Sequence, residues 1–307
     1  RDWSSDVCSS DLGKTITKLG GGLMDFKRIE WIFFLAFLGL NIFLFGIYRE
    51  GQQEESNVSS SSQTESIESR LEKDNISYKG TLSSERLEGY YLSGEQTNFS
   101  AALKIQREKN KNFLRNGLQI ADNTLTSVPS KNYFIDPKKI DKDLSTFLNE
   151  KNALLFGDEY QYLPEFSHLK EPTAEIVAAQ SYKGIPFRDD TAKLSILADT
   201  SGELWKISKY SQTHIENIEE LRDKTDLYSN RDAIDTLYMN NRIPSNSKIT
   251  FIKLAYSRIY KIREKNVYVP VWFVGISTGE DSVEIEQVNA VSNTIITNNT
   301  VPKVEKH

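Results

Sequence analysis

The chain has 307 residues, 38% of them hydrophobic, with a net charge of −5 at pH 7 and a single cysteine. The acidic balance argues against nucleic acid as a partner, and one cysteine cannot form a disulfide within the chain. The length is sufficient for one large domain or two small ones beyond the N-terminal segments.

The first residues, RDWSSDVCSSDL, resemble a translated sequencing adapter rather than a protein segment. The GKTITKLGGGL that follows is typical of translated upstream DNA. We therefore expect residues 1–23 to be non-native and the native chain to start at Met24. Mass spectrometry of the native N-terminus would test this. Cys8 lies in the excluded segment, so we expect no cysteine chemistry in the native protein.

The stretch from Trp31 to Tyr48, WIFFLAFLGLNIFLFGIY, contains eighteen residues and no charge. As a helix it would be about 27 Å long, close to the ~30 Å hydrocarbon core of a bilayer. A buried core helix is the alternative, but such a helix would need a polar face, and Asn41 alone does not make one. The sequence therefore predicts a transmembrane helix over residues 31–48.

Charged residues on the two flanks predict the orientation of this helix. Lys27 and Arg28 precede it, whereas acidic residues follow Arg49. The positive-inside rule then places residues 24–30 in the cytoplasm and the bulk of the chain outside the cell membrane. A cleaved signal peptide is the alternative, but its apolar region is usually shorter. We expect an uncleaved single-pass anchor.

The predicted anchor has two distinct faces. Ala36, Gly39, Phe43 and Gly46 recur on one side at steps of three and four, and Asn41 lies roughly opposite. Small residues permit close approach of another helix, and a membrane asparagine can hydrogen-bond to a neighbour. The faces could contact two different partner helices. Since glycines and one asparagine are also common in simple anchors, both readings stay open.

The remaining chain is predicted to hold a tether, two folded modules and a tail. The segment after the anchor is polar and serine-rich, which is typical of disorder. Apolar and β-branched residues return from about residue 73. The predicted boundaries are 49–72 for the disordered tether, 73–218 and 219–297 for the modules, and 298–307 for the polar tail.

Two segments are predicted helices. The first opens at Asp136-Pro137, an N-cap acid followed by a proline, and carries apolar residues at helical spacing from Ile140 to Leu148. The second opens at a capping-box variant, Ser229 to Asp232, and Pro244 marks its end.

Three predicted strands follow each helix, and their alternating pattern favours antiparallel pairing. Pro270 argues for an edge position or a bulge in its strand. The repeated order predicts an α+β fold of two related modules, each an antiparallel sheet packed on a helix. Leu87–Ser93 is a further predicted strand. The six strands are Ala174–Tyr182, Ala192–Asp199, Glu203–His214, Lys248–Ile262, Val267–Ser277 and Ser282–Ala290.

No catalytic or metal-binding motif is present in the sequence. The three histidines, His168, His214 and His307, do not have metal-ligand spacing, and His214 is interpreted as a surface or boundary residue. The acidic pairs Asp158-Glu159 and Asp189-Asp190 are interpreted as solvated turn acids. We assign no catalytic, cofactor or metal residue and expect no enzyme activity.

Besides the acidic pairs, the sequence contains a basic cluster, KIQREKNK, from Lys104 to Lys111. A solvated face is the default interpretation. Contact with anionic lipid headgroups or with wall polymer is the alternative.

Two stretches carry a family resemblance. The block MDFKRIEWIFFLAFLGLNIFLF from Met24 resembles the start of the YycI family of low-GC Gram-positive bacteria. The distal AIDTLYMNNRIPSNSKITFIKLAYSRIY, followed by VYVPVWFVGIS, is similar to that family's helix, loop and strand pair.

The resemblance implies a non-enzymatic, membrane-anchored regulator that works with a YycH-like protein. The two would bind the YycG/WalK-type sensor histidine kinase of the YycFG (WalKR) two-component system, which controls cell-wall metabolism. It does not imply whether the kinase is activated or inhibited. Two alternatives stay open: an extracytoplasmic chaperone or inhibitor that binds peptides at its sheet edges, and a membrane-tethered cell-wall hydrolase.

Overall fold

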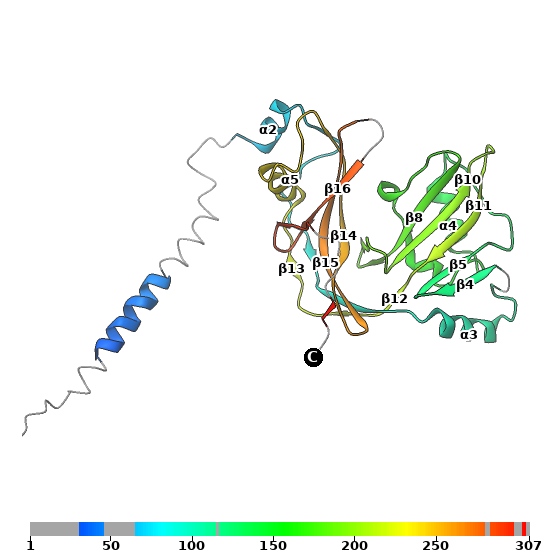
Figure 1. The fold of residues 1–307 in the computed structure, drawn as a ribbon, viewed down its shortest axis with the longest axis horizontal. Coiled ribbons are helices and arrows are strands. Elements are labelled where there is room, and N and C mark those ends of the chain that lie inside the picture. Colours follow the sequence, from blue (N-terminus) through cyan, green and yellow to red (C-terminus); the bar gives the residue numbers. More distant parts are fainter. Residues whose placement is uncertain (1–30, 46–64, 115–116, 280–282, 298–302, 305–307) are drawn as a thin grey trace, which may run out of the picture. The chain divides into compact units, whose positions relative to one another are not determined.

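The structure, a computed structural model, describes residues 31–45, 65–114, 117–279, 283–297 and 303–304. The chain divides into two units, Arg1–Glu65 and Ser66–His307. The first unit contains a helix over residues 31–45, and the second unit holds the sheets (Figure 1). The last three residues of the predicted anchor lie outside the described residues.

Long antiparallel strands form the first of two eight-stranded sheets in the second unit. Its centre is β14 (Lys248–Ile262), β15 (Lys265–Ser277) and β16 (Val283–Asn289). A two-residue hairpin joins β14 to β15, with Arg263 at φ +56°. Of the shorter strands, β1 and β18 pair with β14 in parallel. The shorter strands are β1 (Ser77–Tyr78), β3 (Leu92–Gln96), β12 (Ile215–Glu220), β17 (Thr294–Ile295) and β18 (Lys303–Val304).

The second eight-stranded sheet is antiparallel, with the order β4-β5-β11-β10-β8-β7 and the short strands β6 and β9 attached. A separate pair joins β2 (Glu88–Gly89) to β13 (Thr225–Asp226). The strands of the second sheet are β4 (Leu118–Ala121), β5 (Thr124–Ser127), β6 (Phe134–Ile135), β7 (Tyr160–Tyr162), β8 (Thr173–Tyr182), β9 (Ile185–Pro186), β10 (Lys193–Asp199) and β11 (Trp205–Gln212).

Helices cover the outer parts of both sheets. The apolar face of α4 joins the core of the second sheet, and that of α5 joins the core of the first. A third core, which includes Val177 of β8 and Phe273 of β15, lies between the sheets. The helices of the second unit are α2 (Ile67–Lys73), α3 (Phe99–Lys109), α4 (Ile140–Leu148) and α5 (Asn230–Met239), with short 3-10 helices at Gly157–Glu159 and Pro164–Phe166. The α+β class predicted from the sequence is confirmed.

The capping box predicted for the second helix is present. The Ser229 side chain accepts from the backbone N–H of Asp232, and the Asp232 carboxylate accepts from that of Ser229. The first helix begins later than predicted, at Ile140. Instead of capping it, Asp136 accepts from the N–H of Lys138 in the preceding turn. A local side-chain bond there competes with the helix.

The predicted tether ended at residue 72, but the structure places Ile67–Lys73 in α2. Ile67 and Leu71 are buried in the core that α2 shares with α5. The prediction was wrong at this end. Two apolar residues one helical turn apart are enough to stabilise a short helix when they pack on a partner surface, even in a serine-rich segment.

The prediction of an edge position or a bulge at Pro270 was wrong, because β15 is an internal strand with partners on both sides. One side of β15 pairs with β14 throughout, whereas the other pairs with β3 as far as Tyr268 and with β16 from Val271. Pro270 falls between these two partners. Its carbonyl accepts from Ala290 on that same side, so its missing N–H interrupts no bond to β14.

The chain crosses between the sheets next to β3 and β12, two strands of the first sheet. The prediction of one strand over residues 203–214 was too long, because β11 ends at Gln212 and the chain leaves the second sheet there. It continues as β12, which pairs with β3 in the first sheet. The predicted strand at residues 87–93 is likewise divided into β2 and β3.

Candidate functional site

The helix over residues 31–45 carries the residues predicted to contact partner helices. Every described residue of this helix is exposed. A Cβ built on Gly39 meets nothing within 4 Å, so that face is open for close approach. The Asn41 amide donates to the carbonyl of Phe37 at 2.8 Å, within its own helix. Ala36 and Phe43 belong to the Gly39 face by their spacing, and Gly46 lies outside the described residues.

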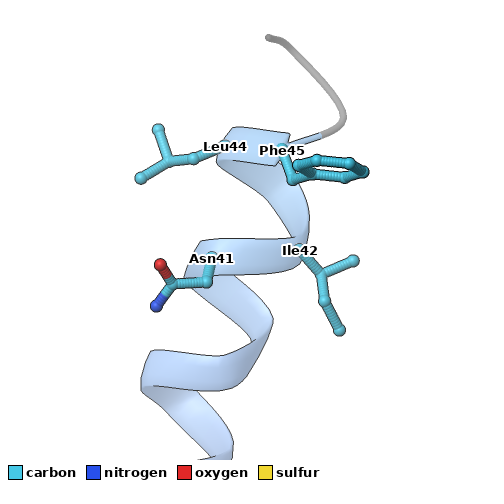
Figure 2. A pocket seen from close by; sticks show the side chains of 4 residues that line it. All are labelled: Asn41, Ile42, Leu44 and Phe45. Atoms are coloured by element: carbon cyan, nitrogen blue, oxygen red, sulfur yellow. The ribbon is translucent and has the colours of Figure 1, made fainter. Parts of the chain in front are cut away.

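Figure 2 shows Asn41 and Leu44 on one side of the last turns of this helix, and Ile42 and Phe45 on the other. The hollow that these four residues line is open and mostly apolar. Among the residues that the structure describes, no helix combines the length and the apolarity needed to cross a membrane.

His214 is buried in a polar cluster, with 4% of its side chain exposed. Its Nε2 lies 3.1 Å from Oε2 of Glu159, and its Nδ1 lies 2.7 Å from Oγ1 of Thr97. Because the carboxylate can only accept, Nε2 carries the hydrogen, and in the neutral ring Nδ1 accepts from the threonine hydroxyl. The ring stacks on Phe156, with 4.1 Å between the ring centroids. The interpretation of His214 as a surface or boundary residue was wrong, because its partners come from distant segments.

Glu159 is the acidic centre of this cluster. The hydrogen bond from His214 is the largest of the causes that hold the pKa of Glu159 below its ordinary value. Gln180 donates to the same carboxylate oxygen at 3.1 Å and also bonds both backbone groups of Ile215. The cluster thereby fixes the start of β12, where the chain crosses from one sheet to the other.

Asp189, itself half-buried, is the centre of a second cluster whose other members include the buried Thr191 and Tyr268. Its carboxylate accepts from the N–H and the hydroxyl of Thr191, and from the N–H of Arg258 at 3.0 Å. Tyr268 in turn donates to the Thr191 hydroxyl at 2.8 Å. Burial raises the pKa of the Asp189 carboxyl above its ordinary value. The interpretation of Asp189 as a solvated turn acid was therefore wrong.

Each cluster joins sequence-distant elements rather than forming an open reactive site. Asp189 follows β9, whereas Arg258 and Tyr268 lie on β14 and β15, so the second cluster ties the sheets together. No sequence signal marks these contacts, because they form between residues as far as 117 positions apart. Among the described residues, no group of three or more His, Cys, Asp or Glu side chains could hold a metal ion.

The first described residues of the second unit form a contact with α5. Glu68 of α2 pairs with Arg231 through two bonds of 2.6 and 2.8 Å. Arg70 pairs with Asp235 at 2.5 Å. Ile67 and Leu71 are buried below these pairs. We call this arrangement the α2–α5 contact.

Comparisons with known proteins identify one family. A family model described as YycI protein matches residues 54–291. Among solved structures, an uncharacterized protein from Eubacterium rectale ATCC 33656 is similar, with 12% sequence identity and a TM-score of 0.36. The alignment covers 73% of this chain and 89% of that one. None of the curated proteins searched matches the chain.

Proposed function

The chain belongs to the YycI family, and from this premise we propose that it is a non-enzymatic membrane-anchored regulator of the YycFG (WalKR) two-component system. It acts with a YycH-like partner on the YycG/WalK-type sensor histidine kinase. The family match over residues 54–291 is the observation that carries this proposal, because it includes the second sheet and all of the first except β17 and β18.

The proposed location is the cell membrane, with a single pass over residues 31–48 and the bulk of the chain outside. The apolar and fully exposed helix over residues 31–45 supports this location, since exposed Phe, Leu and Ile side chains favour lipid over water. Lys27 and Arg28 support a cytoplasmic N-terminus by the positive-inside rule.

Cross-linking in intact membranes, followed by mass spectrometry, tests the partners. We expect cross-links from this chain to a YycH-like protein and to the sensor kinase. Recovery of neither, in a preparation where other known membrane complexes are captured, would reject the regulatory assignment. Kinase autophosphorylation, measured with and without the chain, would show separately whether the regulation activates or inhibits the kinase.

Two faces of the anchor are proposed as the partner-helix contacts. The Gly39 face, with Ala36, Phe43 and Gly46, permits close packing, and Asn41 keeps its carbonyl oxygen and second N–H for a neighbouring helix. Gly39→Leu and Asn41→Leu should each weaken co-purification, but of different partners. Leu38→Ile, which changes neither face, is the matched control. Unchanged co-purification with both variants would reject the two-face proposal.

We also propose that residues 73–218 and 219–297 contain two related modules, with the segment after the anchor as a tether and residues 298–307 as a tail. The order of the main elements supports the relation: α4 precedes β8, β10 and β11, and α5 precedes β14, β15 and β16. An experimental structure in which these two helix-and-strand sets do not superpose would reject it.

A further inference from the structure

Helix α3 has one face fixed in the core of the second sheet. Phe99 and Leu103 are buried, and both belong to the cluster that includes Phe113 and Leu125. Arg107 turns back along the helix end and donates to the carbonyls of Phe113 at 3.1 Å and Leu114 at 2.6 Å. The inner face and the C-terminal end of α3 are therefore anchored, which leaves the outer face in a defined orientation at the periphery of the unit (Figure 1).

The outer face is basic, although the chain as a whole is acidic. Lys104 and Lys109 of α3 are exposed, as is Lys111 just beyond the C-terminal end of the helix, and none of the three pairs with a described acidic residue. Ile105 lies among them with 57% of its surface exposed. We call these four residues the α3 basic face. Glu108, the single acid within residues 104–111, is also exposed and lies one helical turn from Lys104 and Ile105, and the net charge of the segment stays positive.

Simple stabilisation of the helix explains only part of this face. A cation in the last turn interacts favourably with the helix dipole, which accounts for Lys109 and for Arg107. It does not account for Lys104, which lies in the middle of the helix, or for the large exposed side chain of Ile105. An exposed apolar side chain with unpaired lysines nearby is also found in helices that rest on an anionic lipid surface.

We propose that the α3 basic face docks on the anionic headgroups of a bilayer, with Ile105 in the interfacial layer. The proposal rests on the membrane location proposed above. A wall polymer would share the negative charge but offers no apolar layer for Ile105. Each basic side chain near an anionic membrane surface strengthens binding about fivefold, so the three lysines together contribute about 100-fold.

The test uses the full chain reconstituted in vesicles, with an environment-sensitive fluorophore on Ile105→Cys in a Cys8→Ser background. We expect a blue-shifted emission and quenching by a lipid-attached quencher in vesicles containing phosphatidylglycerol, but not in pure phosphatidylcholine. Both signals should be reversed at about 1 M salt, where the screening length falls to about 3 Å. A fluorophore on Met239→Cys, an exposed residue of α5, is the control position.

Lysine variants establish whether the face itself is responsible. Replacing Lys104, Lys109 and Lys111 by Gln should lower the ratio of docked to free α3 about 100-fold. The control replaces three other exposed lysines, Lys138, Lys206 and Lys209, by Gln, so that the net charge changes equally. It should leave the ratio unchanged. Equal losses in both triple variants would overturn the proposal, because the effect would then follow net charge alone.

The remaining outcomes separate lipid docking from its alternatives. The absence of any difference between the two vesicle types overturns the proposal. So does a fluorescence change with soluble polyphosphate but no quenching by lipid, which would assign the face to a polymer. Flotation with pure phosphatidylcholine vesicles tests the anchor independently. If the chain floats with these vesicles but the α3 fluorophore shows no docking signal, only the α3 proposal is refuted. If the chain floats only with vesicles that contain phosphatidylglycerol, only the anchor is refuted.

Discussion

Leu71→Ala tests whether the α2–α5 contact is held by packing or by its ion pairs. Leu71 has no exposed surface and packs in the core that contains Ile234 and Leu237 of α5. Removing a fully buried leucine side chain costs about 2–5 kcal/mol, including the cavity that it leaves. The Glu68–Arg231 pair is about one-third exposed on each side, so its loss should cost about 1 kcal/mol or less.

Packing should therefore dominate. We expect Leu71→Ala to reduce the free energy of unfolding by about 2–5 kcal/mol, and Arg231→Gln by about 1 kcal/mol at most. The assay is urea denaturation of the full chain in detergent micelles, followed by circular dichroism. Leu221→Ala, at a leucine that is 49% exposed, is the control and should change the free energy little.

Hydrogen exchange locates the effect. The amide of Ile76 donates to Leu71 O at 2.8 Å, and that of Asp74 donates to Arg70 O at 3.2 Å. In Leu71→Ala these amides should exchange faster, and more so than the amides within β10. A larger loss of stability in Arg231→Gln than in Leu71→Ala would refute the reasoning, as would unchanged exchange around α2.

Three further predictions concern the buried clusters and a close contact. Burial raises the pKa of Asp189, so the folded protein binds that proton more tightly and loses stability as the pH rises above about 4. In urea denaturation at several pH values, Asp189→Asn should remove this part of the pH dependence of the unfolding free energy. The same pH dependence in the variant and the native protein would contradict the prediction. His214→Phe should raise the pKa of Glu159 toward its ordinary value in an NMR titration, because its main hydrogen bond is lost. In the native protein, Glu159 contributes stability at pH values above its unfolded pKa, and this contribution is lost as the pH falls through its folded pKa. The contribution should be smaller in His214→Phe. Gly275→Ala should cost about 1–3 kcal/mol in thermal denaturation, since a Cβ there would overlap the Phe251 ring; no cost would show that the ring can move aside.

Elements set by short-range patterns could be predicted from the sequence. The bounds of β14 agree with the prediction because the alternation over residues 248–262 is long, and the turn at Arg263 is short. Ser229 and Asp232 define the start of α5 by bonding to each other, which requires no distant residue. The family resemblance likewise depended on contiguous stretches.

Contacts between distant segments could not be predicted. Nothing near Asp189 in the sequence indicates that the N–H of Arg258 will meet its carboxylate. The burial of His214 requires Thr97 and Glu159 together, which lie 117 and 55 residues away. Polar residues of this kind are interpreted as solvated from sequence because burial is costly unless partners are supplied, and only the fold supplies them.

Contacts between distant segments also connect the two sheets of the second unit. Strand β12 carries the chain from the second sheet to β3, and β3 pairs directly with β15 of the first sheet. Asp189 adds a bond from the loop before β10 to β14. Because Leu71 seats α2 on the core of the first sheet, a displacement of α2 acts on that sheet first. It reaches the second sheet through these crossings and through the core that lies between the sheets. Loosening the Asp189 cluster should therefore weaken the coupling between the sheets while leaving the α2–α5 contact in place.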